Sequence, residues 1–260
     1  PLNGFMGRDE INCVLDNYSL PNGSVWTLPI VLQVRSQDFK FGIGEDIELV
    51  CDCCDQAVSS MKVKDVYVFD QHDIAQRWFG STDQRHPGVA RLAQRGDCFV
   101  GGEITLLKQH SSTQLDYCLT PAQVRTIFAN NAWDRVVGFH TRNTPHRAHE
   151  YVMVEAMRRV GADALLIHPV LGQKQPGDFS QEAILKGYEA LIDSDFPSER
   201  ALLNGFFANS WYAGPREAVF TAICRRNFGC SHFVVGRDHT GVGDFYKPMD
   251  VESLFDKLGD

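Results

Sequence analysis

The sequence lacks several patterns that would assign it to common protein classes. It has no run of roughly 18 consecutive apolar residues, so we expect no membrane-spanning helix and no membrane partner. The phosphate-binding loop GxxxxGK[ST] and the dinucleotide-binding pattern GxGxxG are both absent. No charged segment followed by an apolar leader opens the chain, which predicts a protein that is not secreted.

Positive charge is also in short supply. The 25 Lys and Arg residues face 33 Asp and Glu residues, and the formal net charge is −8. Non-specific nucleic-acid binding needs a basic surface, so we expect no nucleic-acid partner. This acidic balance still allows a local basic pocket for a small anion.

The eight cysteines lack the spacing of a zinc site. Only Cys51, Cys53 and Cys54 cluster, in the run CDCC, and no second pair of ligands accompanies them at a fixed spacing. Free thiols in a reducing cytoplasm are the favoured interpretation. We therefore expect a cytoplasmic protein with no dedicated metal site.

What the sequence does contain is enough apolar material for a core, with 43% hydrophobic residues over 260 positions. Its character changes near residue 120. Before that point, runs rich in β-branched and aromatic residues at 24–34, 46–50, 62–69 and 98–107 alternate with Gly, Asp and Pro clusters. They predict a small mixed-β domain over residues 1–119, in the form of a β-barrel.

Residues 120–260 predict an α/β domain. Thr120 and Pro121 are placed to open a helix, as its N-cap and its first helical residue. The short apolar runs 135–139, 164–167, 201–207 and 233–235 predict strands that alternate with helices at 146–160, 180–192 and 214–228. This alternation indicates a parallel sheet, and ligands of such sheets bind beyond the carboxyl ends of the strands.

The loop 140–150, HTRNTPHRAHE, follows the first strand of this domain. His146 and His149 have i and i+3 spacing at a helix start, so both imidazoles should lie on one face. The helix N-terminus favours a phosphate, and Arg142 adds a planar fork for a tetrahedral oxyanion. The spacing and the intervening Arg147 favour an anion over a metal. A solvated helix start with one core histidine is the structural alternative.

Two further loops also follow predicted strands. In the loop 236–243, GRDHTGVG, glycines allow close approach of the backbone to a ligand, Arg237 and His239 suit phosphate, and Asp238 can orient one of them. A plain glycine-rich turn is the alternative. The loop 168–178 contains Lys174 and could close over the site, or it is an ordinary surface loop.

Loops rich in Arg and His, without an acid pair or an activated nucleophile, indicate phosphate electrostatics. Such a site orients an attacking oxyanion in line with a phosphorus atom and absorbs charge on the leaving group. No covalent nucleophile stands out in the sequence. Direct transfer to an anionic acceptor is therefore the simplest mechanism.

Several ordered motifs resemble the sulfate adenylyltransferase (ATP sulfurylase) family. The run HTRNTPHRAHE resembles the family motif QTRNPxHRAHE, and the segments 4–6, 26–32, 80–89, 168–178, 212–218 and 236–243 follow in the family's order. The resemblance implies a PUA-like domain followed by an α/β nucleotidyltransferase domain with a Rossmann-like parallel sheet. It also implies sulfate assimilation by transfer of AMP from ATP to sulfate, with release of pyrophosphate, Mg²⁺ accompanying the ATP, and a homo-oligomer.

The resemblance further implies the roles of individual residues. His146, His149, Arg142 and Asn143 would be catalytic, while His140, Arg142 and Thr240 would bind the acceptor anion. The nucleotide would be bound by both loops, through His140, Thr141, Arg142, Asn143, His146, His149, Gly236, Arg237, Asp238 and His239.

The sequence departs from the family pattern at several points. His140 stands where Gln is expected, and Thr240 where Ala is expected. An amide is a neutral donor, whereas an imidazole can be neutral or cationic near pH 7, so a different oxyanion is an alternative acceptor. Trp211 replaces an expected Arg, and relatives continue beyond this chain with a further phosphate motif. A catalytically weakened nucleotide- or anion-binding relative, truncated at its C-terminus, is a second alternative. An RNA-binding module is a third, which the acidic charge disfavours.

Overall fold

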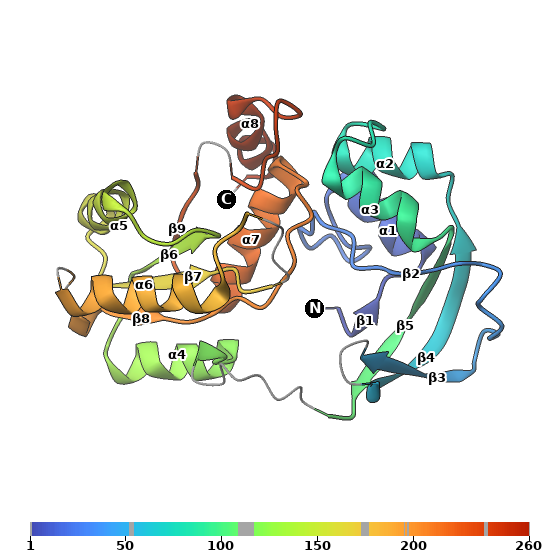
Figure 1. The fold of residues 1–260 in the computed structure, drawn as a ribbon, viewed down its shortest axis with the longest axis horizontal. Helices are drawn as coiled ribbons and strands as arrows, with labels where there is room; N and C mark the ends of the chain where they lie inside the picture. Colours follow the sequence, from blue (N-terminus) through green and yellow to red (C-terminus); the bar gives the residue numbers. More distant parts are fainter. Residues whose placement is uncertain are drawn as a thin grey trace. The chain divides into compact units, whose positions relative to one another are not determined.

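A computed structural model describes residues 2–51, 55–108, 117–172, 177–194, 196, 198–236 and 239–259. The chain forms two compact units, one comprising Pro1–Ser111, Trp211–Phe220 and Asp238–Asp260, the other Ser112–Ser210 and Thr221–Arg237. Figure 1 labels the elements of both units. No helix in the described part of the chain is long and apolar enough to cross a membrane.

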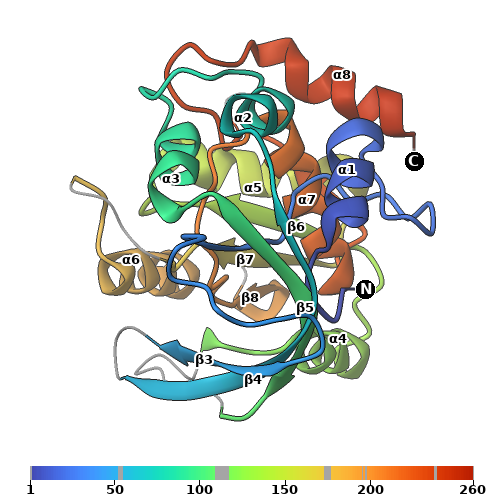
Figure 2. The ribbon, with the colours of Figure 1, turned by 90° about the vertical axis from the view of Figure 1, so that its right-hand side faces the viewer.

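An antiparallel sheet forms the centre of the first unit. Its strands follow the order β1-β5-β4-β3, and β2 also pairs with β5; Figure 2 labels β3, β4 and β5 of this sheet. Within the described ranges, no pairing of β1 with β3 closes the sheet into a ring. The strands are β1 (Gly4–Phe5), β2 (Leu32–Val34), β3 (Asp46–Cys51), β4 (Gln56–Val68) and β5 (Cys98–Leu106).

The expected strand over residues 24–34 is wrong for most of its length, because only Leu32–Val34 pairs with β5. Pro29 lies inside the run and has no N–H to give to a ladder. The apolar side chains of this segment serve the core in an irregular conformation instead: Leu28 is buried, and the Trp26 indole N–H donates to the Leu28 carbonyl at 2.8 Å.

Helices that the sequence analysis did not predict complete the first unit. The Trp78 and Phe79 rings stack at 5.0 Å in their core. Apolar residues of the first three helices share this core with Phe99 of β5, so the description as a mixed-β domain leaves out the helices that build it. The helices are α1 (Arg8–Asn17), α2 (Gln71–Phe79), α3 (Pro87–Arg95) and α8 (Pro248–Leu258).

A parallel sheet of order β8-β7-β6-β9 forms the centre of the second unit, which confirms the α/β prediction. Its strands are β6 (Val136–Thr141), β7 (Ala164–Pro169), β8 (Ala201–Leu203) and β9 (His232–Val234), and the short 3-10 turn Ser198–Arg200 precedes β8. Its helices are α4 (Pro121–Asn130), α5 (Arg147–Val160), α6 (Gln181–Ser194) and the part of α7 (Pro215–Asn227) that begins at Thr221. The strand expected at 201–207 ends early at Leu203, and Phe206 forms only an isolated bridge with Val170.

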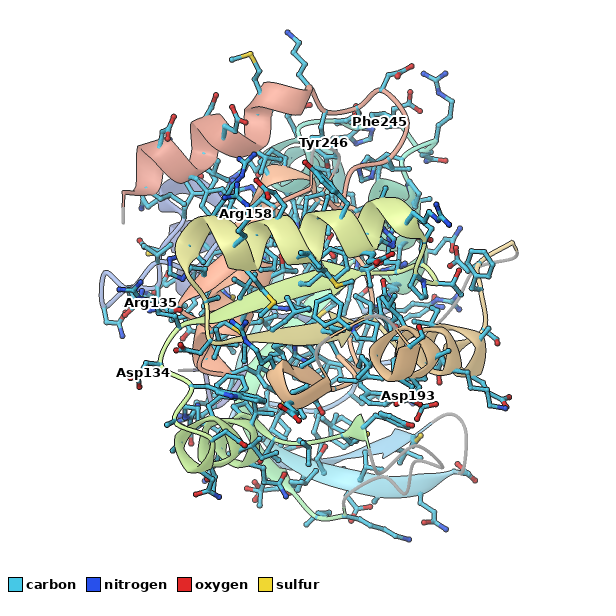
Figure 3. The ribbon with its side chains drawn as sticks, turned by 90° about the vertical axis from the view of Figure 1, so that its left-hand side faces the viewer. Asp134, Arg135, Arg158, Asp193, Phe245 and Tyr246 are labelled. Atoms are coloured by element: carbon cyan, nitrogen blue, oxygen red, sulfur yellow. The ribbon has the colours of Figure 1, made fainter. Side chains whose placement is uncertain are left out.

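The alternation of side chains along β6 divides the core of the second unit. Val137 and Phe139 pack with apolar residues of α5 and α6 on one face of the sheet. Val136 packs on the other face with Val124 and Phe128 of α4. Figure 3 shows α5 and α6 in front of the strands. Successive residues of β6 therefore point to different helices.

The amino ends of β6 and β7 are tied together by one carboxylate. Asp163 accepts hydrogen bonds from the backbone N–H groups of Asp134 and Arg135, at 2.9 and 2.8 Å, and the two donors are labelled in Figure 3. These bonds hold the pKa of Asp163 below its usual value. They also fix the register, so that the two strands end level with each other, Thr141 opposite Pro169.

Candidate functional site

The loops predicted to carry chemistry begin at one edge of the parallel sheet. Thr141 is paired with Pro169, and Phe139 is paired with Val234 on the other neighbour. The chain therefore leaves β6, β7 and β9 at the same carboxyl edge, on strands about 4.8 Å apart. This is the edge at which parallel sheets bind ligands.

The imidazoles of His146 and His149 stack at the start of α5. Their ring centroids are 3.8 Å apart, with an angle of 23° between the ring planes. His146 is the exposed N-cap residue, and its side chain makes no capping hydrogen bond with the described residues. The predicted shared face is thus confirmed, at a helix end whose unpaired N–H groups favour an anion.

His149 is the more enclosed member of the pair. Its ring lies 5.4 Å from the ring of Phe139 on β6, and its Nδ1 lies 3.4 Å from the buried hydroxyl of Tyr188 on α6. Loss of solvent lowers the pKa of His149, and the nearby His146 lowers it further. In the free protein, His149 is therefore neutral near pH 7. A bound anion would stabilise its imidazolium form and so favour protonation of the ring.

The turn between β6 and α5 is shaped by local contacts. The buried Thr141 hydroxyl accepts a hydrogen bond from the Asn143 N–H at 3.1 Å. Gly187 of α6 lets the turn pack closely, because a Cβ at that position would lie 2.7 Å from Cδ of Pro145. Arg142 is half-buried and Asn143 is exposed. These residues follow β6 directly, so the turn presents them at the carboxyl edge.

His140 points to the opposite face of β6, away from the stacked pair. Its Nδ1 lies 2.7 Å from Nη2 of Arg225, a fully buried residue of α7. Gly138 provides the space, since a Cβ there would lie 2.9 Å from Cγ of Arg225. The strand alternation thus separates His140 from His149, and His140 meets a buried cation.

His168 belongs to β7 rather than to the loop after it. It is fully buried beside His140, with its Nε2 3.4 Å from Nδ2 of Asn204. Burial and then the charge of Arg225 lower the pKa of His168 well below its usual value, so this ring is neutral. Lys174, which the sequence analysis considered as a closing residue, lies outside the described residues.

The glycine-rich loop is divided between the two units. Gly236 is exposed just beyond β9 in the second unit, while Arg237 and Asp238 lie outside the described residues. His239 and Thr240 are buried in the first unit. The Thr240 hydroxyl lies 3.0 Å from the Gly214 carbonyl and 2.7 Å from the His239 carbonyl. A hydroxyl has one proton, so these carbonyls leave it none to donate to an anion.

Trp211, where an Arg was expected, belongs to an aromatic and cationic cluster of the first unit. Its ring lies 5.0 Å from Trp78, and the guanidinium carbons of Arg91 and Arg95 lie 5.4 and 5.6 Å from its ring centre. The backbone N–H of Trp211 donates to the Glu217 carboxylate at 3.1 Å. The indole thus adds no charge of its own but makes cation–π contacts with two guanidinium groups.

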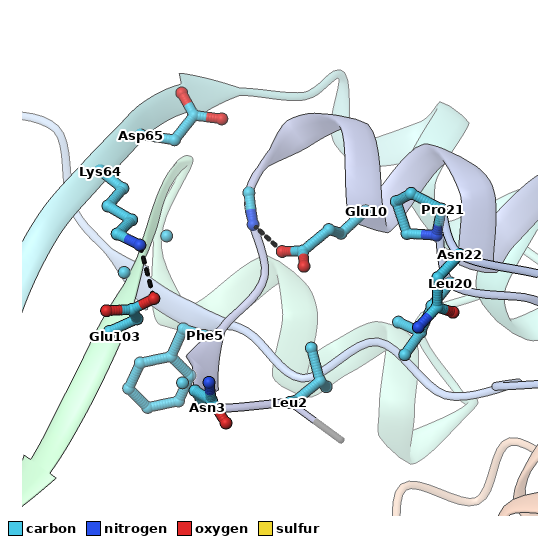
Figure 4. Close-up of a pocket in the computed structure, with 14 residues that line it drawn as sticks. Leu2, Asn3, Phe5, Glu10, Leu20, Pro21, Asn22, Lys64, Asp65 and Glu103 are labelled. Atoms are coloured by element: carbon cyan, nitrogen blue, oxygen red, sulfur yellow. Dashed lines mark hydrogen bonds and ion pairs between the residues drawn. The ribbon is translucent and has the colours of Figure 1, made fainter. Parts of the chain in front are cut away.

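A cavity of about 460 Å³ in the first unit offers less chemistry. Figure 4 shows Lys64 paired with Glu103 at 2.6 Å, and Glu10 accepting from the Gly7 N–H at 2.9 Å. None of the predicted site residues lines it. Among the described residues no cluster of three or more His, Cys, Asp or Glu side chains could hold a metal ion, and Cys53 and Cys54 lie outside that set.

Sequence reasoning missed Arg225 and Tyr188. Both belong to helices whose apolar spacing is typical of helices that pack against a core. Neither residue is part of a motif that the sequence analysis identified. Arg225 carried one signal: it is a charged residue directly after the largely apolar run AVFTAIC. Its meaning depends on Gly138, a contact partner more than eighty residues earlier.

The fold defines the class, an α/β protein with a parallel sheet, joined to a PUA-like domain. The family model of ATP-sulfurylase matches residues 115–260, and that of the PUA-like domain matches residues 1–109. The chain belongs to the ATP-sulfurylase family.

Relatives named sulfate adenylyltransferase match nearly the whole chain. The one from Symbiobacterium thermophilum is 43% identical over 99% of this chain and 65% of its own length. The one from Pyrococcus abyssi is 42% identical over 100% of this chain and 67% of its own length. The chain thus spans about two thirds of the relatives' length. A hexameric APS kinase from Thiobacillus denitrificans shares the fold, with a TM-score of 0.74 at 24% identity, over 100% of this chain and 45% of that one.

Proposed function

We propose that this chain carries out the adenylyl transfer of its relatives, forming adenylyl sulfate and pyrophosphate from ATP and sulfate. The observation that carries the proposal is the stacked imidazole pair at the uncapped start of α5, directly beyond β6. A phosphate chain is the ligand class that such a helix end and two imidazoles recognise together.

In the proposed reaction, a sulfate oxygen attacks the α-phosphorus of ATP in line with the bond to the β-phosphate. That bond breaks, and its electrons leave with pyrophosphate. His146 and His149 would hold the phosphates, and the growing negative charge would favour the protonated form of His149, which the free protein disfavours. This difference between free and bound states is a source of transition-state selectivity.

The other residues would position the two anions. Arg142 and Asn143, presented by the turn after β6, would orient the acceptor and the phosphates. His140 would bind the acceptor, and for Thr240 the proposed role toward the acceptor rests on the family resemblance. Thr141 fixes the turn through Asn143. For Gly236, Arg237, Asp238 and His239, the proposed contact with nucleotide rests on the family resemblance.

The substrate would be ATP accompanied by Mg²⁺, as the family resemblance implies. The free cysteines among them, of which Cys98 and Cys230 are buried, suit a reducing cytoplasm. We further propose that residues 120–260 carry the chemistry, that residues 1–119 form a separate PUA-like β domain, and that the protein assembles with copies of itself.

The test is release of pyrophosphate by the 260-residue chain with MgATP and a panel of oxyanions: sulfate, selenate, molybdate, phosphate and a phosphonate. Sulfate and its structural analogues should give ATP-dependent release, with adenylyl sulfate as the product of the sulfate reaction. A longer relative serves as the positive control.

Two other outcomes would each overturn part of the proposal. Turnover with another oxyanion but none with sulfate would assign a different acceptor, as the exchanges at His140 and Thr240 allow. Binding of ATP in calorimetry without turnover on any anion would identify a nucleotide-binding relative. That second outcome is a real alternative because Trp211 stands where the family pattern has a positively charged Arg.

A further inference from the structure

Arg225 is a buried cation beneath the carboxyl ends of β6 and β7. Its side chain is 0% exposed. The guanidinium donates to His140 Nδ1 at 2.7 Å, to the His168 carbonyl at 3.2 Å and to the Thr221 carbonyl at 3.4 Å, and it lies 4.3 Å from the ring centre of Phe206. All of these partners are neutral groups. Arg225 is therefore unlike a structural ion pair.

The chemistry of the Arg225 contact fixes the proton of His140. A guanidinium has only donors, so Nδ1 of His140 must accept with its lone pair. A ring whose Nδ1 lacks a proton carries it on Nε2 if it is neutral. The doubly protonated imidazolium cannot make this hydrogen bond, because two donors would face each other at 2.7 Å.

The described titratable groups that can be placed near His140 are neutral or cationic. His168 is its register neighbour on β7 and is neutral. From the α7 side, burial raises the pKa of the Cys224 and Cys230 thiols to about 11 and about 12, so both stay protonated. Arg142 is a cation two residues along the chain, and His149 of α5 belongs to the other face of the strand.

We propose that Arg225 is a positioning residue that holds His140 as a neutral Nε2–H donor. His140 then offers an anion what the side-chain amide of Gln would offer: a proton donor without charge, with its other polar atom accepting from Arg225. The exchange of Gln for His would change the shape of the acceptor pocket but keep its charge. This inference rests on the proposed function only in placing the acceptor at His140.

Nitrogen NMR of the full chain tests the tautomer without any activity. Histidine labelled with ¹⁵N gives correlations that distinguish the two tautomers and the imidazolium, and His140→Gln identifies the His140 signals by their loss. We expect an unprotonated Nδ1 and a protonated Nε2 at pH 7, unchanged as the pH falls through 6.5. An imidazolium, or a proton on Nδ1, would overturn the proposal.

A pH profile tests whether Arg225 is the cause. In Arg225→Met, Nδ1 of His140 loses the donor that keeps it unprotonated, so the imidazolium should form as the pH falls and the acceptor KM should then fall on the order of tenfold. The wild type should show no such step, and adding His140→Gln to Arg225→Met should remove it. Arg226→Met, at an exposed position of the same helix, is the matched control.

The outcomes separate the two proposals. A chain without turnover on any oxyanion would sink the proposed function, and the NMR spectra would still decide the tautomer. If Arg225→Met does not fold, the wild-type spectra and the wild-type pH profile still decide, since a KM step near pH 6.5 that is lost in His140→Gln would contradict a permanently neutral ring.

Discussion

At the scale of single residues, the proposed chemistry depends most on His149. Its ring is held by Phe139 and Tyr188, yet its partner His146 is exposed, so the pair has one fixed and one accessible member. Replacing His149 with Ala should lower kcat about 10²–10³-fold, the usual effect of losing one preorganised donor. His72→Ala, at an exposed position of α2, is the control. Pyrophosphate release by a folded His149→Ala protein at the wild-type rate would contradict the role.

Arg142 poses a question of geometry rather than charge. A guanidinium can contact a tetrahedral oxyanion through two parallel N–H groups, while an ammonium offers a single point of charge. We expect Arg142→Lys to raise the acceptor KM by roughly tenfold or more, the equivalent of about 1.4 kcal/mol. Lys is the matched replacement because it keeps the charge. An unchanged acceptor KM, measured by pyrophosphate release, would remove Arg142 from the acceptor site.

The sequence was sufficient to predict the pair His146 and His149, because helical spacing is a local property. It was insufficient for His140. Whether that ring is neutral depends on Arg225, which reaches it only because Gly138 leaves room in the strand. Contacts of this kind join distant parts of the chain, and periodicity carries no information about them.

At the scale of elements, the start of α4 shows how much one cap contributes. The Thr120 hydroxyl accepts from the Gln123 N–H at 3.3 Å, and the Gln123 side chain accepts from the Thr120 N–H at 2.8 Å. Thr120→Ala should therefore lower the free energy of unfolding by about 1 kcal/mol. Thr126→Ala, the same exchange at an exposed interior position of α4, should cost nothing, since Ala favours a helix. Equal losses in chemical denaturation would contradict the capping role.

This helix and the parallel strands were predictable because helix caps and short apolar strands depend on residues that are close together in the sequence. The helices of the first unit were not predicted, and there is a physical reason for this. The residues 71–79 and 87–95 have helical caps in Asp70 and His86, whose side chains accept from backbone N–H groups. A histidine is an unusual cap, and it works here because His86 is fully buried and its Nε2 lies 3.0 Å from the Tyr212 carbonyl.

At the scale of the whole molecule, the two family models divide the chain at a different place from the two compact units. The family models meet between residues 109 and 115, whereas the first compact unit also takes up Trp211–Phe220 and Asp238–Asp260. Helix α7 contributes to both units, with Arg216 donating to carbonyls of α1 in the first and Arg225 reaching His140 in the second. A substitution in α7 can thus affect either unit, so separate readouts of each are needed.

Stability against acid is a property of the whole chain, and buried histidines contribute to it above the range in which carboxylates titrate. Burial is the first cause that lowers the pKa of His86, His149 and His168 below 6.5. The unfolded chain therefore binds more protons than the folded chain as the pH falls through 6.5, so the stability present above that pH is progressively lost. For a buried group, a folded-state pKa that lies one pKa unit lower than in the unfolded chain corresponds to about 1.4 kcal/mol of this pH-dependent free energy of unfolding.

We expect the Tm to fall between pH 7.5 and 5.5, with His168 as the largest contributor because it is fully buried beside Arg225. His168→Gln should lower the Tm at pH 7.5 but flatten its dependence on pH, since an amide takes up no proton. His72→Gln, at an exposed position, should keep the wild-type slope. Thermal unfolding followed by circular dichroism measures both slopes. If His168→Gln and wild type lost the same number of degrees over this range, the acid sensitivity would have to come from other groups.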